Sequence, residues 1–83
     1  MNYYVYILYS VRFNKYYIGQ TQDIIQRFAE HNAQKVPSTA PFVPWQRVGV
    51  IEKNTRSEAM ELEKKLKNLN RLRLESFIEK YMK

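Results

Sequence analysis

Two short segments rich in β-branched and aromatic residues begin the chain, and they constrain its fold more than any other feature. Residues 2–9 read Asn-Tyr-Tyr-Val-Tyr-Ile-Leu-Tyr, and residues 16–21 read Tyr-Tyr-Ile-Gly-Gln-Thr. Both compositions favour strands, and the polar loop between them contains Asn14, which tolerates a tight turn. We therefore predict an antiparallel hairpin. Gly19 is unusual there, because glycine weakens a strand unless a bend or a close approach requires the missing side chain.

The middle of the chain predicts a helix, a loop and a third strand. Thr21 is a plausible N-cap for a helix that extends to about residue 33, with Asp23 in its first turn. Its expected buried stripe is formed by Ile24, Ile25, Phe28 and Ala29. All three prolines lie in residues 34–44, which predicts an irregular loop, and residues 45–52 follow as a strand.

The last third of the chain predicts two helices. Thr55 and Glu58 have the spacing of a capping box for a helix that ends near residue 69. Asn70 is a plausible cap for a final helix whose apolar residues follow helical spacing, namely Leu74, Phe77, Ile78 and Tyr81. The resulting order ββαβαα predicts a small α+β fold, a three-stranded antiparallel sheet flanked by helices, with residues 1–83 as one domain.

Charge and composition narrow the function. The 83 residues contain 14 Lys and Arg against 8 Asp and Glu, a net charge of +6, which favours nucleic acid as a partner ahead of an anionic membrane. Cysteine is absent, which excludes disulfides, thiolate catalysis and zinc fingers. The longest apolar run, residues 3–9, is far shorter than the ~20 residues of a membrane span. We expect a cytoplasmic protein that does not associate with membranes.

Glu63 breaks the pattern of its own helix. On a helical wheel it lies between Ala59 and Met60, on the side that should be buried. A carboxylate beside an apolar stripe is costly unless it is paired or binds a cation. An ordinary ion pair with Lys67, four residues further on, is the alternative explanation.

The first helix places two cationic or titratable groups at the margin of its buried stripe. Arg27 and His31 are four residues apart and therefore lie on one face. A guanidinium beside an imidazole suits a site that grips a phosphate while a second group handles a proton. The alternative is that both are ordinary boundary residues, which is the usual case for a lone histidine near the edge of a core.

The hairpin resembles the GIY-YIG nuclease superfamily, whose name spells its two strand motifs. Tyr4-Val5-Tyr6 stands at the first motif and Tyr17-Ile18-Gly19 matches the second. Arg27 and His31 fit the positions that the family uses in its first helix. Ala59, Glu63 and Leu66 fit its Ala-x-x-x-Glu-x-x-Leu pattern. The likeness covers residues 3–69 and is that of the short bacterial members.

This resemblance implies an endonuclease that hydrolyses nucleic-acid phosphodiesters with one divalent ion, Mg²⁺ or Mn²⁺. Glu63 would hold the metal and Arg27 would pair with phosphate oxygens. One of Tyr6 and Tyr17 would deprotonate or orient the attacking water, and the other would orient neighbouring groups. His31 would relay a proton or position a tyrosine. Gly19 would let the backbone and the substrate approach closely.

The resemblance also implies DNA more than RNA as substrate, with a role in repair or recombination and a possible targeting protein. The expected phosphate contacts are Lys15, Lys35, Lys64, Lys67 and Arg71. Gln20 stands where some repair nucleases of the family carry a lysine, and Glu75 where they carry an asparagine. A weakly active or inactive nucleic-acid-binding module of the same fold is the alternative, and a protein-interaction module with exposed aromatic residues has no specific support.

Overall fold

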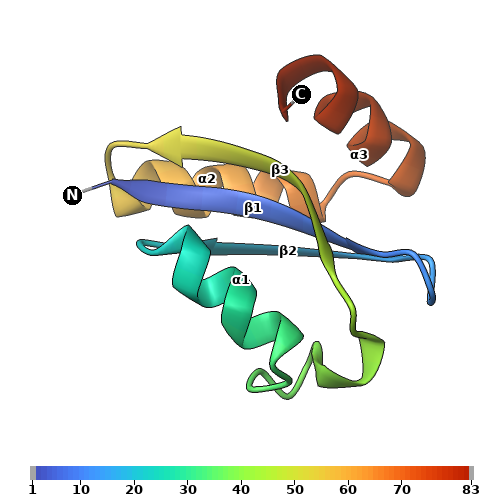
Figure 1. The fold of residues 1–83 in the computed structure, drawn as a ribbon. Helices are drawn as coiled ribbons and strands as arrows, with labels where there is room; N and C mark the ends of the chain where they lie inside the picture. The colour runs from blue at the N-terminus through green and yellow to red at the C-terminus, as the bar shows by residue number, and fades with distance from the viewer. Residues whose placement is uncertain (1, 83) are drawn as a thin grey trace.

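The first strand, β1 (Tyr3–Ser10), is the central strand of a three-stranded antiparallel sheet. It pairs on one side with β2 (Lys15–Thr21) and on the other with β3 (Gln46–Lys53), so the strand order is β2-β1-β3 (Figure 1). The computed structural model describes residues 2–82. The predicted hairpin, third strand and order of elements are confirmed, and β2 is an outer strand of the sheet.

Helices cover both faces of this sheet (Figure 1). One face packs against α1 (Ile24–Asn32), and the other packs against α2 (Arg56–Lys67) and α3 (Arg71–Phe77). A short 3₁₀ turn, Ala40–Phe42, interrupts the loop before β3, and a π-helical turn, Ile78–Met82, follows α3. Within residues 2–82 the structure contains no helix with the length and apolar character that crossing a bilayer requires.

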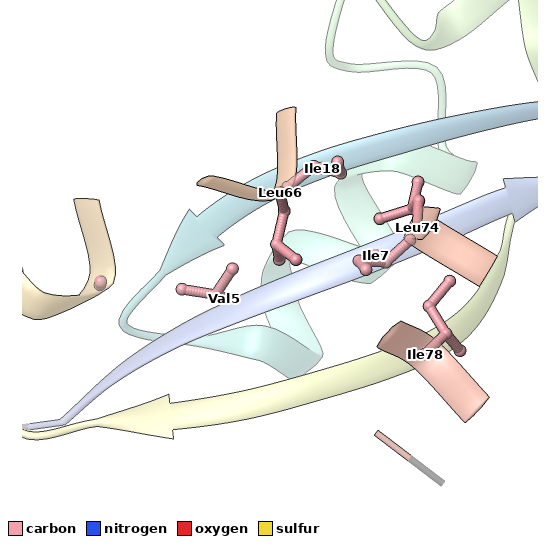
Figure 2. Packing of buried hydrophobic residues seen from close by; sticks show 7 residues of the cluster. Val5, Ile7, Ile18, Leu66, Leu74 and Ile78 are labelled. Atoms are coloured by element: carbon pink, nitrogen blue, oxygen red, sulfur yellow. The ribbon is translucent and has the colours of Figure 1, made fainter. Parts of the chain in front are cut away.

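The alternation of side chains along β1 divides the core into two clusters. Odd-numbered positions of β1 face α2 and α3, where Val5 and Ile7 pack with Ile18, Leu66 and Leu74 (Figure 2). Even-numbered positions face α1 and the loop that follows it, where the buried members of the cluster are Tyr6, Leu8 and Trp45. The buried residues of the even-numbered face are therefore largely aromatic, whereas those of the odd-numbered face are aliphatic, with Tyr3, Tyr16 and Phe77 partly buried around them.

The start and the buried face of α1 differ from the prediction. Asp23, not Thr21, is the N-cap, and its Oδ1 accepts a hydrogen bond from the backbone N–H of Gln26 at 3.0 Å. The side chain of Ile25 is 77% exposed, and Ala29 is also exposed. The predicted burial of these two residues was wrong, because the helix turns His31, a polar residue with buried partners, into the core instead.

The caps of the later helices are as predicted. Thr55 is the N-cap of α2, and its side chain accepts from the backbone N–H of Glu58. Asn70 is the N-cap of α3 and accepts from the backbone N–H of Arg73 at 2.9 Å. The last turn is wider than an α-helix, and Tyr81 is exposed there, although Leu74 and Ile78 are buried as expected.

Gly19 lies directly opposite Tyr6 in the pairing of β1 with β2. A Cβ atom at this glycine would lie 2.6 Å from the Tyr6 Oη and 2.7 Å from the Tyr6 Cζ. These distances are too short for any side chain, so the close approach that the sequence suggested is made by the ring of Tyr6. The missing side chain of Gly19 is what allows Tyr6 to lie across the strand.

We expect Gly19→Ala to lower the free energy of unfolding by about 1–3 kcal/mol, because the new methyl group overpacks a buried ring that cannot move away. Gly49→Ala is the matched control, since it makes the same change in β3. Its Cβ would meet the Met82 Sδ at 2.6 Å and the Met82 Cβ at 2.8 Å, so relief requires a new thioether rotamer and a small shift of the last turn, Ile78–Met82, rather than of a strand of the sheet. Urea unfolding of the two variants measures the difference, and equal losses would contradict this account of Gly19.

Candidate active site

A line of buried hydrogen bonds connects β1 with α1 and the loop after it. The Tyr6 hydroxyl and the His31 Nε2 are 2.8 Å apart, and the His31 Nδ1 and the Thr39 Oγ1 are also 2.8 Å apart. Tyr6 is 1% exposed, and His31 and Thr39 are fully buried. The sequence predicted His31 at the margin of the buried stripe of its helix, whereas the structure places it inside the core with a partner on each ring nitrogen.

Arg27 joins this line at its solvent end. It forms an ion pair with Glu30, with 3.1 Å between Nη1 and Oε1, and its guanidinium also lies near the Tyr6 hydroxyl. Both of these interactions raise the pKa of Arg27, the Glu30 contact most, although partial burial opposes them. The Arg27 side chain is 38% exposed, so its guanidinium, although paired with Glu30, can still contact a ligand.

Burial dominates the protonation of the Tyr6 and His31 pair. It raises the pKa of Tyr6 to about 12, although the guanidinium of Arg27 acts in the opposite direction. Burial also lowers the pKa of His31, and the positive charge of Arg27 lowers it further. At neutral pH Tyr6 therefore keeps its proton, and His31 is a neutral imidazole with one N–H and one acceptor nitrogen.

The Glu63 carboxylate lies on the other side of the sheet, at the rim between α2 and β2. Its Oε1 accepts a hydrogen bond from the Gln20 Nε2 at 2.9 Å, and its Oε2 lies 2.8 Å from the Lys67 Nζ. The Glu63 side chain is only 19% exposed. The helical wheel located this carboxylate correctly, and the ion pair with Lys67 that the sequence allowed as an alternative is formed.

Two hollows meet at Gln20, on the outer edge of β2. The first, of about 760 Å³, lies against α2 and is lined by Gln20, Arg56, Ser57, Met60, Glu61, Glu63, Lys64, Lys67 and Asn68. The second, of about 430 Å³, lies against the start of α1 and is lined by Gln20, Thr21, Gln22, Asp23, Gln26, Arg27 and Glu30. The carboxylate of Glu63 and the guanidinium of Arg27 thus line adjoining hollows on opposite sides of one edge strand.

A further sign of this proximity is the electrostatic effect on Tyr6. Burial is the largest cause of its raised pKa, and the negative charge of Glu63 is among the smaller causes that raise it further. The structure brings Tyr6, Arg27 and His31 together on one face of the sheet. Glu63 lies on the other face, against Gln20 of β2.

The two tyrosines differ in access to solvent. Tyr17 lies on the same face of the sheet as Tyr6, with 6.4 Å between their ring centroids and 5.0 Å between the rings of Tyr17 and His31. Tyr17 is half-buried, whereas Tyr6 is almost fully buried. A molecule that enters from solvent can therefore reach Tyr17 more readily than Tyr6.

The five predicted phosphate contacts do not form one patch around these hollows. Lys64 and Lys67 line the first hollow. Arg71 donates to the backbone carbonyl of Asn14 at 3.0 Å, which places it at the turn of the hairpin, and Lys15 begins β2 beside that turn. Five residues separate Lys15 from Gln20, or about 17 Å of strand. Lys35 is exposed in the loop after α1.

A metal at this site would have few protein ligands. Among residues 2–82 no three His, Cys, Asp or Glu side chains lie close enough together to bind one ion. Glu63 offers a carboxylate at the wall of an open hollow, and the amide oxygen of Gln20 is a second hard donor beside it. This donor set fits an ion such as Mg²⁺, which usually keeps several waters and takes one or two protein oxygens.

Sequence reasoning missed two partners of the site. Thr39 lies in the proline-containing loop, where no periodicity marks a buried side chain, and only the folded structure shows it against His31. Gln20 was noted for the lysine it replaces, but its position between the two hollows and its bond to Glu63 were not expected. The available signal was that Gln20 follows Ile18 by two residues on a strand. Residues at this spacing share a face, so Gln20 points to the same side of the sheet as the buried Ile18.

Comparison with known protein families gives the class of this domain, which is that of a nuclease family. The chain belongs to the GIY-YIG family, because the description of the GIY-YIG catalytic domain matches residues 2–76. The chain is also similar to the solution NMR structure of the UPF0213 protein BH0048 from Bacillus halodurans. The two chains are 30% identical with a TM-score of 0.65, and the match covers 99% of this chain and 87% of the other. Comparison with curated proteins gives no significant match.

The buried neutral His31 makes stability depend on pH in a predictable direction. Its pKa is lower in the folded protein than the ordinary value near 6.5, so its contribution is complete above about pH 6.5 and is lost as the pH falls toward the folded pKa. The slope due to this residue is at most about 1.4 kcal/mol per pH unit. The chain has one histidine. Urea unfolding between pH 8 and 5.5, for the protein and for His31→Gln, should therefore show this acid-side slope in the parent protein only.

Proposed function

We propose that this protein is a divalent-metal-dependent endonuclease that hydrolyses phosphodiester bonds of nucleic acid, with DNA as its main substrate. The observation that carries the proposal is the placement of Glu63 and Arg27 on adjoining hollows at the edge of β2. Nucleases of the GIY-YIG family generally use divalent metal ions. Glu63, with Gln20 beside it, would hold one such ion, Mg²⁺ or Mn²⁺.

The metal, when bound, would neutralise charge on the phosphate and on the leaving oxygen. The protein's own residues would do the rest. Arg27, which is paired with Glu30 and lies near Tyr6, would pair through its remaining N–H groups with phosphate oxygens. Tyr17 is the tyrosine that solvent can reach, so we assign to it the contact with the attacking water. The buried Tyr6 and His31 would orient Arg27 rather than touch the substrate.

Substrate affinity would come first from the cations of the first hollow. Lys64 and Lys67 lie beside Glu63, and Arg56 lines the same hollow. Contacts of this kind follow the phosphate backbone and weaken with salt, and they carry little sequence specificity. We propose a role in DNA repair or recombination in the cytoplasm. A partner protein that selects the substrate would supply the specificity. Only a longer nucleic acid, one that extends past the hairpin turn, would also contact Lys15, Lys35 and Arg71.

A catalytically weak or inactive nucleic-acid-binding module is the second candidate. It is favoured by one observation, that Gln20 and Lys67 already occupy both oxygens of Glu63. In this case the protein would bind nucleic acid in a salt-dependent manner, but no divalent ion would give cleavage.

The decisive experiment compares the protein with Glu63→Gln on supercoiled, branched and single-stranded DNA and on structured RNA, each with Mg²⁺, Mn²⁺ or EDTA. We expect metal-dependent nicking by the parent protein and a loss of at least about a hundredfold in the variant, because its amide cannot hold the ion as the carboxylate does. Binding in EDTA should change little. Glu58→Gln is the control, since it makes the same charge change on the same helix outside both hollows and preserves the capping box. Binding without cleavage in every metal would support the second candidate.

We also expect Lys67→Met to strengthen binding of Mn²⁺ by about two- to fivefold, because the ion no longer competes with an ammonium group worth about 0.5–1 kcal/mol. Electron paramagnetic resonance of free Mn²⁺ measures this affinity without any substrate. Lys65→Met removes the same charge from the same helix without touching Glu63, so it separates the direct contact from the general loss of positive charge. Equal gains in both variants would show that Lys67 does not compete for the metal position.

A further inference from the structure

The hydrogen bonds that connect Tyr6, His31 and Thr39 lead to one group whose chemistry is fixed. At the solvent side, the Arg27 guanidinium lies near the Tyr6 hydroxyl and lowers the pKa of Tyr6 against the larger effect of burial, and a guanidinium can only donate. At the inner end, the Thr39 Oγ1 lies 3.3 Å from the backbone carbonyl of Val36, and a carbonyl can only accept. Tyr6, His31 and Thr39 lie between these ends.

The fixed acceptor determines the direction of every donor along the line. The Thr39 hydroxyl has the Val36 carbonyl as its acceptor, so its oxygen accepts from the His31 ring and the Tyr6 hydroxyl is left to donate to the His31 Nε2. The Nε2 must then be the acceptor nitrogen, and the ring proton lies on Nδ1, which donates to the Thr39 Oγ1. The Thr39 hydroxyl in turn donates to the Val36 carbonyl. All of these groups are satisfied in this one arrangement.

The opposite tautomer of His31 fits less well. An N–H at Nε2 would point a donor at the Tyr6 oxygen, beside the guanidinium of Arg27. The Tyr6 proton would then have no acceptor among the contacts of residues 2–82, although the side chain is buried. The hydroxyl of Thr39 would also turn from Val36 to the ring. Unpaired buried donors are costly, so the first arrangement is the favoured one.

We propose that Thr39 is a positioning residue that fixes His31 as its Nδ1–H tautomer, so that Tyr6 presents an oxygen lone pair to Arg27. The role of this arrangement in catalysis rests on the proposed nuclease function, in which Arg27 holds the phosphate. Backbone hydrogen bonds hold Thr39 in place without its hydroxyl. The Thr39 carbonyl accepts from the Trp45 Nε1 at 3.0 Å, and the Thr39 N–H donates to the Val36 carbonyl at 3.1 Å. The side chain is therefore free to serve His31.

The experiment uses ring-¹⁵N-labelled histidine, and the chain's one histidine makes the assignment unambiguous. Long-range ¹H–¹⁵N correlation spectra at pH 7.5 distinguish the two neutral tautomers from each other and from the imidazolium. We expect the Nδ1–H tautomer in the parent protein and in Thr39→Ser. In Thr39→Val, which keeps the shape but removes the acceptor, we expect the population to shift toward Nε2–H. A parent protein with the Nε2–H tautomer overturns the proposal, whether or not the valine variant folds, and so does an unchanged tautomer in Thr39→Val.

The cleavage assay then tests the consequence for Arg27. We expect the rate of Thr39→Val to fall by about tenfold or more, as is typical when the partner that orients a functional histidine is lost, and Thr39→Ser to restore most of it. A valine variant that changes tautomer but cleaves at the parental rate would overturn the positioning role. Absence of cleavage in the parent protein would overturn the nuclease function instead, since the tautomer is measured without substrate.

Discussion

The contact between the Tyr6 ring and Gly19 is the constraint on which the rest of the site depends. Because Gly19 has no side chain, the ring of Tyr6 lies across β2, and its hydroxyl reaches the His31 Nε2 on α1. The same hydroxyl lies near Arg27, which precedes His31 by one turn of α1. A single absent methyl group on one strand thus lets a side chain of the neighbouring strand organise the polar face of a helix. The glycine of the family's second motif is thus required here for the packing of the Tyr6 ring, independently of any contact with substrate.

The fold was largely readable from local sequence signals. Alternating β-branched and aromatic residues identified the strands, and side chains with known capping chemistry identified the starts of α2 and α3. The face of α1 was misjudged because apolar character was taken as the guide to burial. His31 is buried there with a hydrogen-bond partner on each ring nitrogen, and Ile25 is left outside. A polar residue whose groups are all paired competes well for the core, and its partners come from distant parts of the chain.

Apart from the spacing of Arg27 and His31 and the strand motifs, the candidate site was readable from the sequence where a residue conflicted with its own element. Glu63 interrupted an apolar helical face and Gly19 interrupted a strand, so both could be singled out from the sequence. Thr39 and Gln20 conflict with nothing, since a threonine suits a loop and a glutamine suits an edge strand. Their importance comes from pairing across 8 residues for Thr39 with His31 and 43 residues for Gln20 with Glu63. Such pairings follow from the packing of α1 and α2 against the sheet, which no local pattern specifies.

In the proposed function, the Glu63 carboxylate would exchange its ion pair with Lys67 for a metal ion. Lys67 supplies a cation to a carboxylate that is otherwise only partly solvated, which stabilises the folded protein when no metal is bound. The ammonium itself is about half exposed, so its attraction is screened and contributes about 1 kcal/mol or less. A doubly charged ion with its own hydration shell can replace it at little cost. Lys67, once displaced, stays on the wall of the same hollow, where a phosphate bound next to the ion is a new partner for its charge. The pair therefore protects the carboxylate without closing the site.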